Sequence, residues 1–279
     1  MKESTLIGLS IFIYLASWVS YLVHAAFGKK KGPGIVGDVL VVSGLLAQTS
    51  AIGVRWWESY RLGIGHAPLS NLYESMIFFS WTIALIYLLV ARRLETRLLG
   101  VFVMPLVCLS VASTSLMNQQ IQPLVPALQS NWLTAHVVTC FLGYAAFAVA
   151  FCFSLLYLLK ARGTASPGGY LQRNLPGAEL LDEFSYRMIA VGFPLMSLGI
   201  ITGAAWANSA WGSYWTWDPK ETWSLIVWLI YAAYLHARIA RGWKGRRAAI
   251  LSLVGFAATM FCYLGVNLLL SGLHSYATG

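Results

Sequence analysis

Eight long apolar segments constrain the fold of this 279-residue chain more than any other feature of the sequence. A helix needs about 20 mostly apolar residues to cross ~30 Å of hydrocarbon, and each segment is close to that length. Only 10% of the residues are charged, which is too few to cover a soluble domain with a water-facing surface. The sequence therefore predicts one all-α polytopic membrane domain over residues 1–279. The expected spans are about 5–27, 35–55, 69–91, 98–116, 132–159, 186–206, 223–240 and 248–270.

The basic residues predict how these helices are oriented. If the first segment ends in the cytoplasm, 15 of the 19 Lys and Arg residues fall on the cytoplasmic side. The other four are Lys2, Arg55, Arg61 and Lys220. Because cytoplasmic loops of membrane proteins carry an excess of Lys and Arg, we expect both termini on the outer (periplasmic or lumenal) side. The net charge of +9 is then an orientation signal and not a nucleic-acid-binding surface.

Two further features exclude other kinds of site. The Gly- and Pro-rich stretch 161–185 is predicted to be a cytoplasmic linker loop without a catalytic motif. The four cysteines lie within apolar segments, and none forms a Cys-x-x-Cys pair. We therefore interpret them as small core residues rather than a thiol relay.

Half of the twelve tryptophans fall between residues 206 and 228, at the predicted outer end of the sixth and seventh helices. An interfacial aromatic belt is one explanation, but a belt places one or two aromatic residues at each helix end. Several flat side chains in one loop, with a few polar groups, favour a platform for a large planar ligand. The predicted platform is the loop 207–223, with Trp211, Trp215 and Trp217 at its centre.

The end of this loop also has a simple structural interpretation. Asp218, Pro219 and Glu221 have the spacing of an N-cap, a first-turn proline and a capping box. Asp218 therefore has two possible roles, as a helix cap and as part of the ligand site.

Two of the five histidines are predicted on the same side as the tryptophan loop. His136 lies one turn into the fifth helix, and His274 follows the eighth. A planar ligand with a central metal and two axial imidazoles would use both histidines and the loop, and haem fits that description. A zinc site would need three or four protein ligands, and a serine hydrolase would need a nucleophile elbow; the sequence has neither.

His236 is predicted in the cytoplasmic half of the seventh helix, followed by Arg238 and Arg241. One interpretation is a second haem site with arginines for the propionates. The other is a buried histidine beside arginines that extend to the cytoplasmic interface.

The segment from His66 to Glu74 opens the third helix. Glu74 lies inside the span, where a carboxylate is costly unless it is paired. We predict a hydrogen-bonded network around Asn71, Tyr73 and Glu74, and direct ligation by His66 is the alternative. His24 receives no role.

Residues 211–221 (Trp-Gly-Ser-Tyr-Trp-Thr-Trp-Asp-Pro-Lys-Glu) resemble the signature W-G-x-x-W-x-W-D-x-x-E of the haem-handling "WWD" family. The resemblance extends over most of the chain, through the His66 segment, the region around His136, His236 and the C-terminal Gly-Leu-His-Ser-Tyr. The length and the eight spans suit the CcsA (ResC) branch of that family.

The resemblance implies a function and a set of roles. His136 and His274 correspond to axial ligands of the haem iron, and His236 to a membrane histidine that holds haem on its way across. Trp211, Trp215 and Trp217 would cover the ring, Asp218 would orient the loop, and Lys220 would meet a propionate. The transient ligand would be haem b, delivered to a Cys-x-x-Cys-His segment of an apocytochrome c together with a CcsB (ResB)-type partner.

In this interpretation the chain is the haem-binding subunit of a holocytochrome c synthase and supplies no catalytic residue of its own. It would lie in the bacterial cytoplasmic membrane or the thylakoid membrane, with its haem site facing the periplasm or lumen. Two alternatives remain open: a haem exporter without a direct part in ligation, and an electron-transferring membrane cytochrome.

Overall fold

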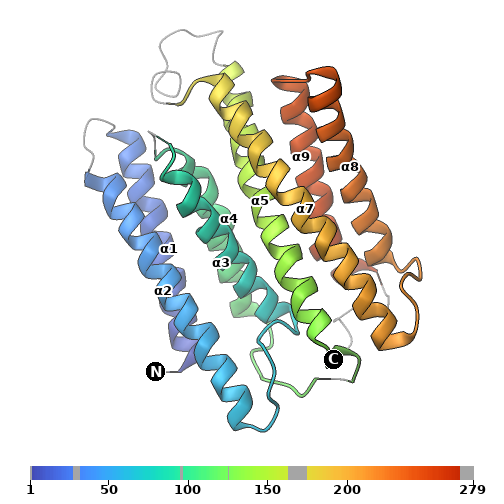
Figure 1. Ribbon diagram of the computed structural model, residues 1–279. Helices are drawn as coiled ribbons and strands as arrows, with labels where there is room; N and C mark the ends of the chain where they lie inside the picture. Colours follow the sequence, from blue (N-terminus) through green and yellow to red (C-terminus); the bar gives the residue numbers. More distant parts are fainter. Residues whose placement is uncertain (1, 28–31, 95–96, 125, 163–174, 271–279) are drawn as a thin grey trace. The chain divides into compact units, whose positions relative to one another are not determined.

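The computed structural model describes residues 2–27, 32–94, 97–124, 126–162 and 175–270 (Figure 1). Within these residues eight helical segments are long and apolar enough to cross a membrane, which confirms the predicted number, and no strand occurs. The helices are α1 (Glu3–Ala26), α2 (Gly32–Arg61), α3 (Leu72–Ala91), α4 (Leu99–Ser113), α5 (Asn131–Arg162), α7 (Ala178–Trp211), α8 (Pro219–Arg241) and α9 (Arg246–Met260). Shorter elements are η1 (Thr114–Leu116), η2 (Pro126–Leu128), η4 (Phe261–Gly265) and α10 (Val266–Leu269).

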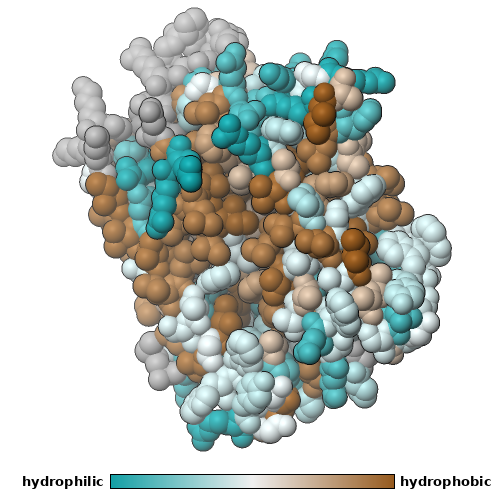
Figure 2. Space-filling view, viewed as in Figure 1, coloured by the Kyte–Doolittle hydropathy of each residue, from teal (hydrophilic) through white to brown (hydrophobic). Residues whose placement is uncertain are grey.

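The chain forms two compact units. Unit 1 contains α1 to α4, and unit 2 contains α5 to α10. In the face seen in Figure 2, hydrophobic side chains cover the middle of the helices, and hydrophilic side chains gather toward the helix ends. This distribution is the one that a bilayer requires of its spanning helices.

In unit 1, α1 packs closely along α2 because glycines of α2 lie beneath tyrosine rings of α1. A Cβ atom on Gly37 would lie 2.6 Å from the ring of Tyr21, and one on Gly44 would lie 2.5 Å from the ring of Tyr14. The Tyr14 hydroxyl donates to Gln48 Oε1 at 2.9 Å, and the Gln48 amide donates to a carbonyl of α3. Small residues and interhelical hydrogen bonds are the usual means of helix association in membranes.

In unit 2, α5 packs along α7 through the same kind of contact. A Cβ atom on Gly143 of α5 would lie 3.1 Å from backbone atoms of α7, and one on Gly199 of α7 would lie 2.5 Å from Cys140 Sγ. On another face of α5, the ring of Phe147 stacks on that of Tyr231 of α8 with centroids 3.7 Å apart. The helix that carries His136 is therefore held between two neighbours.

Two helices extend more than five residues past a predicted end. α2 continues from the predicted end at residue 55 to Arg61, because polar side chains in its last two turns have partners inside unit 1. α7 begins at Ala178 instead of residue 186, and its first turns place Asp182 in an ion pair with Arg238 of α8. Residues 178–185 of the predicted linker are thus helical, and residues 163–174 lie outside the described residues.

The prediction that the cysteines are core residues is confirmed. Cys140, Cys152 and Cys262 are buried, Cys108 is half-buried, and none of the four forms a disulfide.

Candidate functional site

His136 lies on α5, five residues after the helix begins at Asn131, and its imidazole faces α7. The contact is possible because the facing residue of α7 is a glycine. A Cβ atom on Gly203 would lie 2.6 Å from His136 Nδ1 and 2.8 Å from Cε1. The predicted position one turn inside the fifth helix is confirmed, whereas the glycine beneath the ring was not predicted.

The hydrogen bond of His136 to α7 defines which ring nitrogen carries the hydrogen. Nδ1 lies 2.7 Å from the carbonyl oxygen of Gly199. A carbonyl oxygen only accepts, so Nδ1 carries the hydrogen, and the lone pair of the neutral ring is on Nε2. Metal-ligating histidines commonly donate their second ring N–H to a backbone carbonyl in this way.

Two tryptophans of α7 continue the aromatic surface from His136. The Trp206 ring stacks on the imidazole with centroids 6.0 Å apart and an interplanar angle of 24°. Trp211 meets Trp206 edge to face at 5.1 Å. Trp206 is buried. The cluster of His136, Trp206 and Trp211 is therefore part of the packing between α5 and α7, whereas the aromatic residues of an interfacial belt face the membrane surface.

The loop between α7 and α8 begins at Gly212, with a φ of +77°, and ends at Asp218. Trp215 and Trp217 meet edge to face within it, with centroids 5.7 Å apart. The indole N–H of Trp215 is buried and has no hydrogen-bond partner among the described residues. Trp217 is the one described non-glycine residue with a positive φ, at +60°, and its side chain is 68% exposed. A strained backbone, an exposed indole and an unsatisfied buried donor are features typical of ligand sites.

Asp218 caps α8 as predicted. Its side chain accepts from the Lys220 backbone N–H at 2.9 Å, and Glu221 completes the capping box by accepting from the Asp218 N–H. Glu221 also accepts from the Thr216 N–H at 2.7 Å. Both carboxylates are buried, so this pair joins the tryptophan loop firmly to the first turn of α8.

Lys220 has hydrogen-bond partners on η4 and α10. Its ammonium donates to Asn267 Oδ1 at 2.7 Å, and its backbone carbonyl accepts a hydrogen bond from the Cys262 thiol. The predicted meeting of Lys220 with a propionate would thus require this ammonium to share its donors with Asn267.

His236 lies apart from this cluster, 17 residues after the start of α8 at Pro219, or about 25 Å along the helix at ~1.5 Å per residue. Its side chain is exposed. The interpretation of His236 as a buried histidine beside interfacial arginines is therefore wrong. The neighbouring Arg238 is buried and donates to Asp182 at 2.5 Å. An arginine already paired in this way is poorly placed to serve a propionate.

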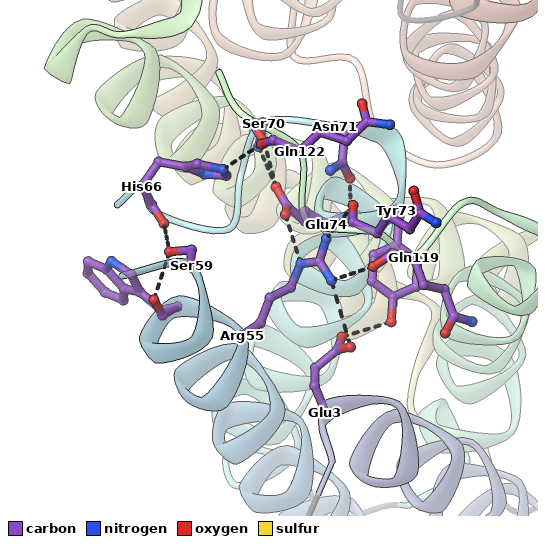
Figure 3. A network of polar contacts seen from close by, with 12 residues as sticks. Glu3, Arg55, Ser59, His66, Ser70, Asn71, Tyr73, Glu74, Gln119 and Gln122 are labelled. Carbon is purple, nitrogen blue, oxygen red and sulfur yellow. Dashed lines mark hydrogen bonds and ion pairs between the residues drawn. The ribbon is translucent and has the colours of Figure 1, made fainter. Parts of the chain in front are cut away.

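Unit 1 contains a second polar cluster, where α1 begins, α2 ends and α3 begins (Figure 3). Arg55 Nε donates to Glu74 at 2.7 Å, and its NH1 group lies 3.7 Å from Glu3. NH1 also donates to the Gln119 carbonyl at 2.9 Å. The Tyr73 hydroxyl donates to Glu3 at 2.7 Å. Glu3, Arg55 and Glu74 are all buried. The predicted network around Glu74 is confirmed, and its cation is Arg55, which the sequence placed at the outer end of the second predicted span.

The loop before α3 completes the network. Glu74 accepts from the backbone N–H and the hydroxyl of Ser70, each at 2.8 Å, while Asn71 caps α3. The ring nitrogens of His66 lie 2.9 Å from the Ala67 carbonyl and 3.3 Å from the Gln122 carbonyl. Since both nitrogens face backbone carbonyls, neither is directed at open space, and His66 lacks the arrangement that a metal ligand needs.

His274, the second predicted axial ligand, lies outside the described residues. Among the residues that are described, no group of three or more His, Cys, Asp or Glu side chains is arranged to hold a metal ion. A site here would therefore have few protein ligands, as in bis-imidazole haem binding.

Known proteins resemble this chain over most of its length. The family "Cytochrome C assembly protein" matches residues 69–274. The "Cytochrome c biogenesis protein CcsA" of Synechococcus elongatus is 41% identical, with 98% of this chain and 97% of the relative covered. The proteins of the same name from Parasynechococcus marenigrum and Prochlorococcus marinus are 44% and 43% identical, with 91% and 86% of this chain covered and 90% and 84% of the relatives.

The fold is also found in a solved structure. A chain described as "Cytochrome c Heme Lyase CcmF" matches with a TM-score of 0.71 over 94% of this chain and 46% of that one, at 19% identity. The likeness at this identity concerns the fold alone, and less than half of the longer protein is involved. The family match and the near-full-length relatives show that this chain belongs to the cytochrome c assembly family, and within it to the CcsA proteins.

Proposed function

We propose that this protein binds haem at the outer face of the membrane, through His136 and His274, and presents it for covalent attachment to apocytochrome c. A CcsB-type membrane protein would be its partner, and haem b would be its cargo. The observation that carries the proposal is the geometry of His136. Gly199 fixes the proton on Nδ1, so that Nε2 keeps the lone pair that binds iron.

The surroundings of His136 support a flat ligand. Trp206 and Trp211 extend the aromatic surface beside the imidazole. The exposed Trp217 and the unsatisfied N–H of Trp215 give the loop an apolar surface and a free donor. Large planar ligands are bound by this combination of aromatic area and a few polar groups. The family to which the chain belongs is named for cytochrome c assembly, and haem is the planar group that such assembly requires.

Thioether formation between haem and an apocytochrome would require no reacting group from this chain. Each thioether forms when an acceptor thiol adds across a haem vinyl group, with the C–S bond at one carbon and the hydrogen at the other. Bonds and electrons balance without an added oxidant or reductant. The four cysteines here are half-buried or buried core residues, so the thiols belong to the acceptor. This chain contributes by holding the ring in place while the acceptor approaches, which is catalysis by positioning.

The test is the absorption spectrum of the purified full-length protein and of three variants: His136→Gly, His274→Gly and the double variant. Bis-imidazole haem has a recognisable spectrum, which we expect in the wild type and not in the double variant. Added imidazole should restore it in His136→Gly by occupying the space of the missing ring. Haem content unchanged in the double variant would show that the axial-ligand assignment is wrong.

His66→Gly is the matched control. It removes an imidazole whose nitrogens face carbonyls, so haem content per folded protein should stay at the wild-type value. Co-expression with a CcsB-type partner and an apocytochrome then separates binding from delivery. A His136→Gly variant that still matures cytochrome c at the normal rate without added imidazole would contradict the proposed role.

A further inference from the structure

A pocket of about 440 Å³ lies in unit 1, between the start of α2 and the end of α3. The Arg55 cluster lies toward the other end of α2. α2 and α3 are joined nearer their other ends, where Gln48 donates to the Ile77 carbonyl and Trp81 donates to Thr49. Beyond these contacts the two helices leave a space that no described side chain fills. The lining residues are Asp38, Val39, Val42, Ser43, Leu88, Ala91, Arg92, Leu94 and Arg97.

Within the part of the chain that the structure describes, one arginine that lines this pocket has no ion-pair partner. Arg97 Nε donates to Asp38 at 2.6 Å, and the Tyr21 hydroxyl donates to the other oxygen of the same carboxylate at 2.8 Å. Asp38 is therefore occupied by its own neighbours. Arg92 is exposed and forms no ion pair with any described residue. The lining residues have a net charge of +1, located at the ends of the helices.

The apolar part of the pocket is one helical turn deeper in the span. Val42 follows Asp38 by four residues on α2, and Leu88 precedes Arg92 by four residues on α3. Val39 and Val42 are both exposed, so their side chains are available to a ligand. A molecule that fits must have an anionic end at the level of the helix termini and an apolar body that extends toward the bilayer centre.

We propose that this pocket binds the headgroup and upper acyl chains of a singly anionic phospholipid such as phosphatidylglycerol. Arg92 would donate to the phosphate, and Val42 and Leu88 would contact the chains. Basic pockets between transmembrane helices are known sites for anionic lipid headgroups. The single arginine without an ion pair among the described residues matches one phosphate charge, whereas haem would bring two propionates. The site is independent of the haem function proposed above.

The experiment is native mass spectrometry of the full-length protein in dodecyl maltoside, titrated with phosphatidylglycerol or with phosphatidylcholine of the same acyl chains. We expect one preferential phosphatidylglycerol adduct in the wild type. Arg92→Ala should weaken it about fivefold or more, the factor expected for loss of one basic residue near a lipid phosphate. Arg93→Ala is the control, because it removes the same charge from an exposed neighbour that does not line the pocket. Val42→Trp, which fills the apolar part, should also abolish the preference.

Each other outcome overturns the proposal. Equal loss in the Arg92 and Arg93 variants would show a diffuse basic surface, and equal binding of phosphatidylcholine would show that the charge is not recognised. Competition by inorganic phosphate as effective as that by lipid would make the ligand a free anion. Displacement of the lipid by an equal concentration of haem would assign the pocket to haem. Circular dichroism of each variant confirms that it is folded.

Discussion

At the residue scale, the contact between His136 and α7 depends on the absence of a side chain at Gly203. Any Cβ atom there would lie 2.6 Å from Nδ1, a distance at which the imidazole or the helix must move. We expect Gly203→Ala to shift the ring away from the Gly199 carbonyl and to weaken haem binding by about tenfold or more, the usual cost of losing a partner to a metal-ligating histidine. The measurement is haem titration followed by absorbance.

Gly8→Ala is the control for this variant, since a Cβ at that helical position of α1 meets nothing within 4 Å. The Gly203 and Gly8 variants have the same change in composition and helix propensity. Equal haem affinities in the two would show that the packing of the imidazole on α7 has no part in binding.

Arg55 is the buried cation of the polar cluster in unit 1. Its removal leaves Glu3 and Glu74 buried without a cation, and breaking a buried ion pair by removing one partner typically costs about 3–5 kcal/mol. Arg55→Leu should therefore lower the free energy of unfolding in detergent by roughly that amount. Arg61→Leu removes an arginine from the last turn of the same helix, where the guanidinium lies 4.8 Å from the Trp57 ring centroid, and should cost less than about 1 kcal/mol. Similar unfolding curves for the two variants would contradict the assignment.

Single residues were predictable where their chemistry alone demanded a partner. Glu74 inside a span required a network, and Asp218 before Pro219 required a cap; both were found. The partners themselves were not predictable, because Glu3 and Glu74 meet Arg55 only after three helices have packed. The same holds for Gly199, Gly203 and Trp206 beside His136. A Gly-x-x-x-Gly pair in an apolar helix predicts close packing against another helix. It does not identify which helix that is.

At the scale of elements, the hydrogen bonds of the capping box join the tryptophan loop to the first turn of α8. Asp218→Ala should lower the free energy of unfolding by about 1 kcal/mol through loss of the N-cap. Asp218→Asn should leave it nearly unchanged, because asparagine caps helices as well as aspartate does. Thermal unfolding in detergent measures both, with Ser209→Ala at an exposed position near the end of α7 as the control for a neutral substitution.

The haem content of the same two variants decides whether Asp218 also has a direct role. If its only function is the cap, Asp218→Asn binds haem like the wild type. Loss of haem in this variant, with unfolding unchanged, would mean that the negative charge itself is needed at the ligand site.

The spans were predicted well because apolar length is a property of the sequence alone. Their ends were not, for two different reasons. α2 continues past residue 55 since Arg55 and Ser59 have hydrogen-bond partners in unit 1. α7 starts early since Asp182 pairs with Arg238. In both cases a tertiary ion pair supports polar residues in a helix, and hydropathy alone would have ended the helix before them.

At the scale of the whole molecule, the distribution of basic residues predicts that both termini face outward. Alkaline phosphatase, which is active only outside the cytoplasm, should be active when fused after residue 279 and inactive when fused after Arg93. Green fluorescent protein at the same two positions should give the opposite pattern, fluorescing only after Arg93. An active phosphatase after Arg93 would invert the orientation and place the tryptophan loop on the cytoplasmic side.

The network of unit 1 has a consequence for the order of biosynthesis. Arg55 bonds to Glu3 and Glu74 and to the carbonyl of Gln119, so its partners are spread over more than a hundred residues of chain. During translation Arg55 is added to the chain before Glu74, and the Gln119 carbonyl is added only after α4. Until Gln119 has been made, Arg55 lacks one of the partners that it has in the folded unit. The first half of the chain can lock into its final arrangement only when its fourth helix has been inserted.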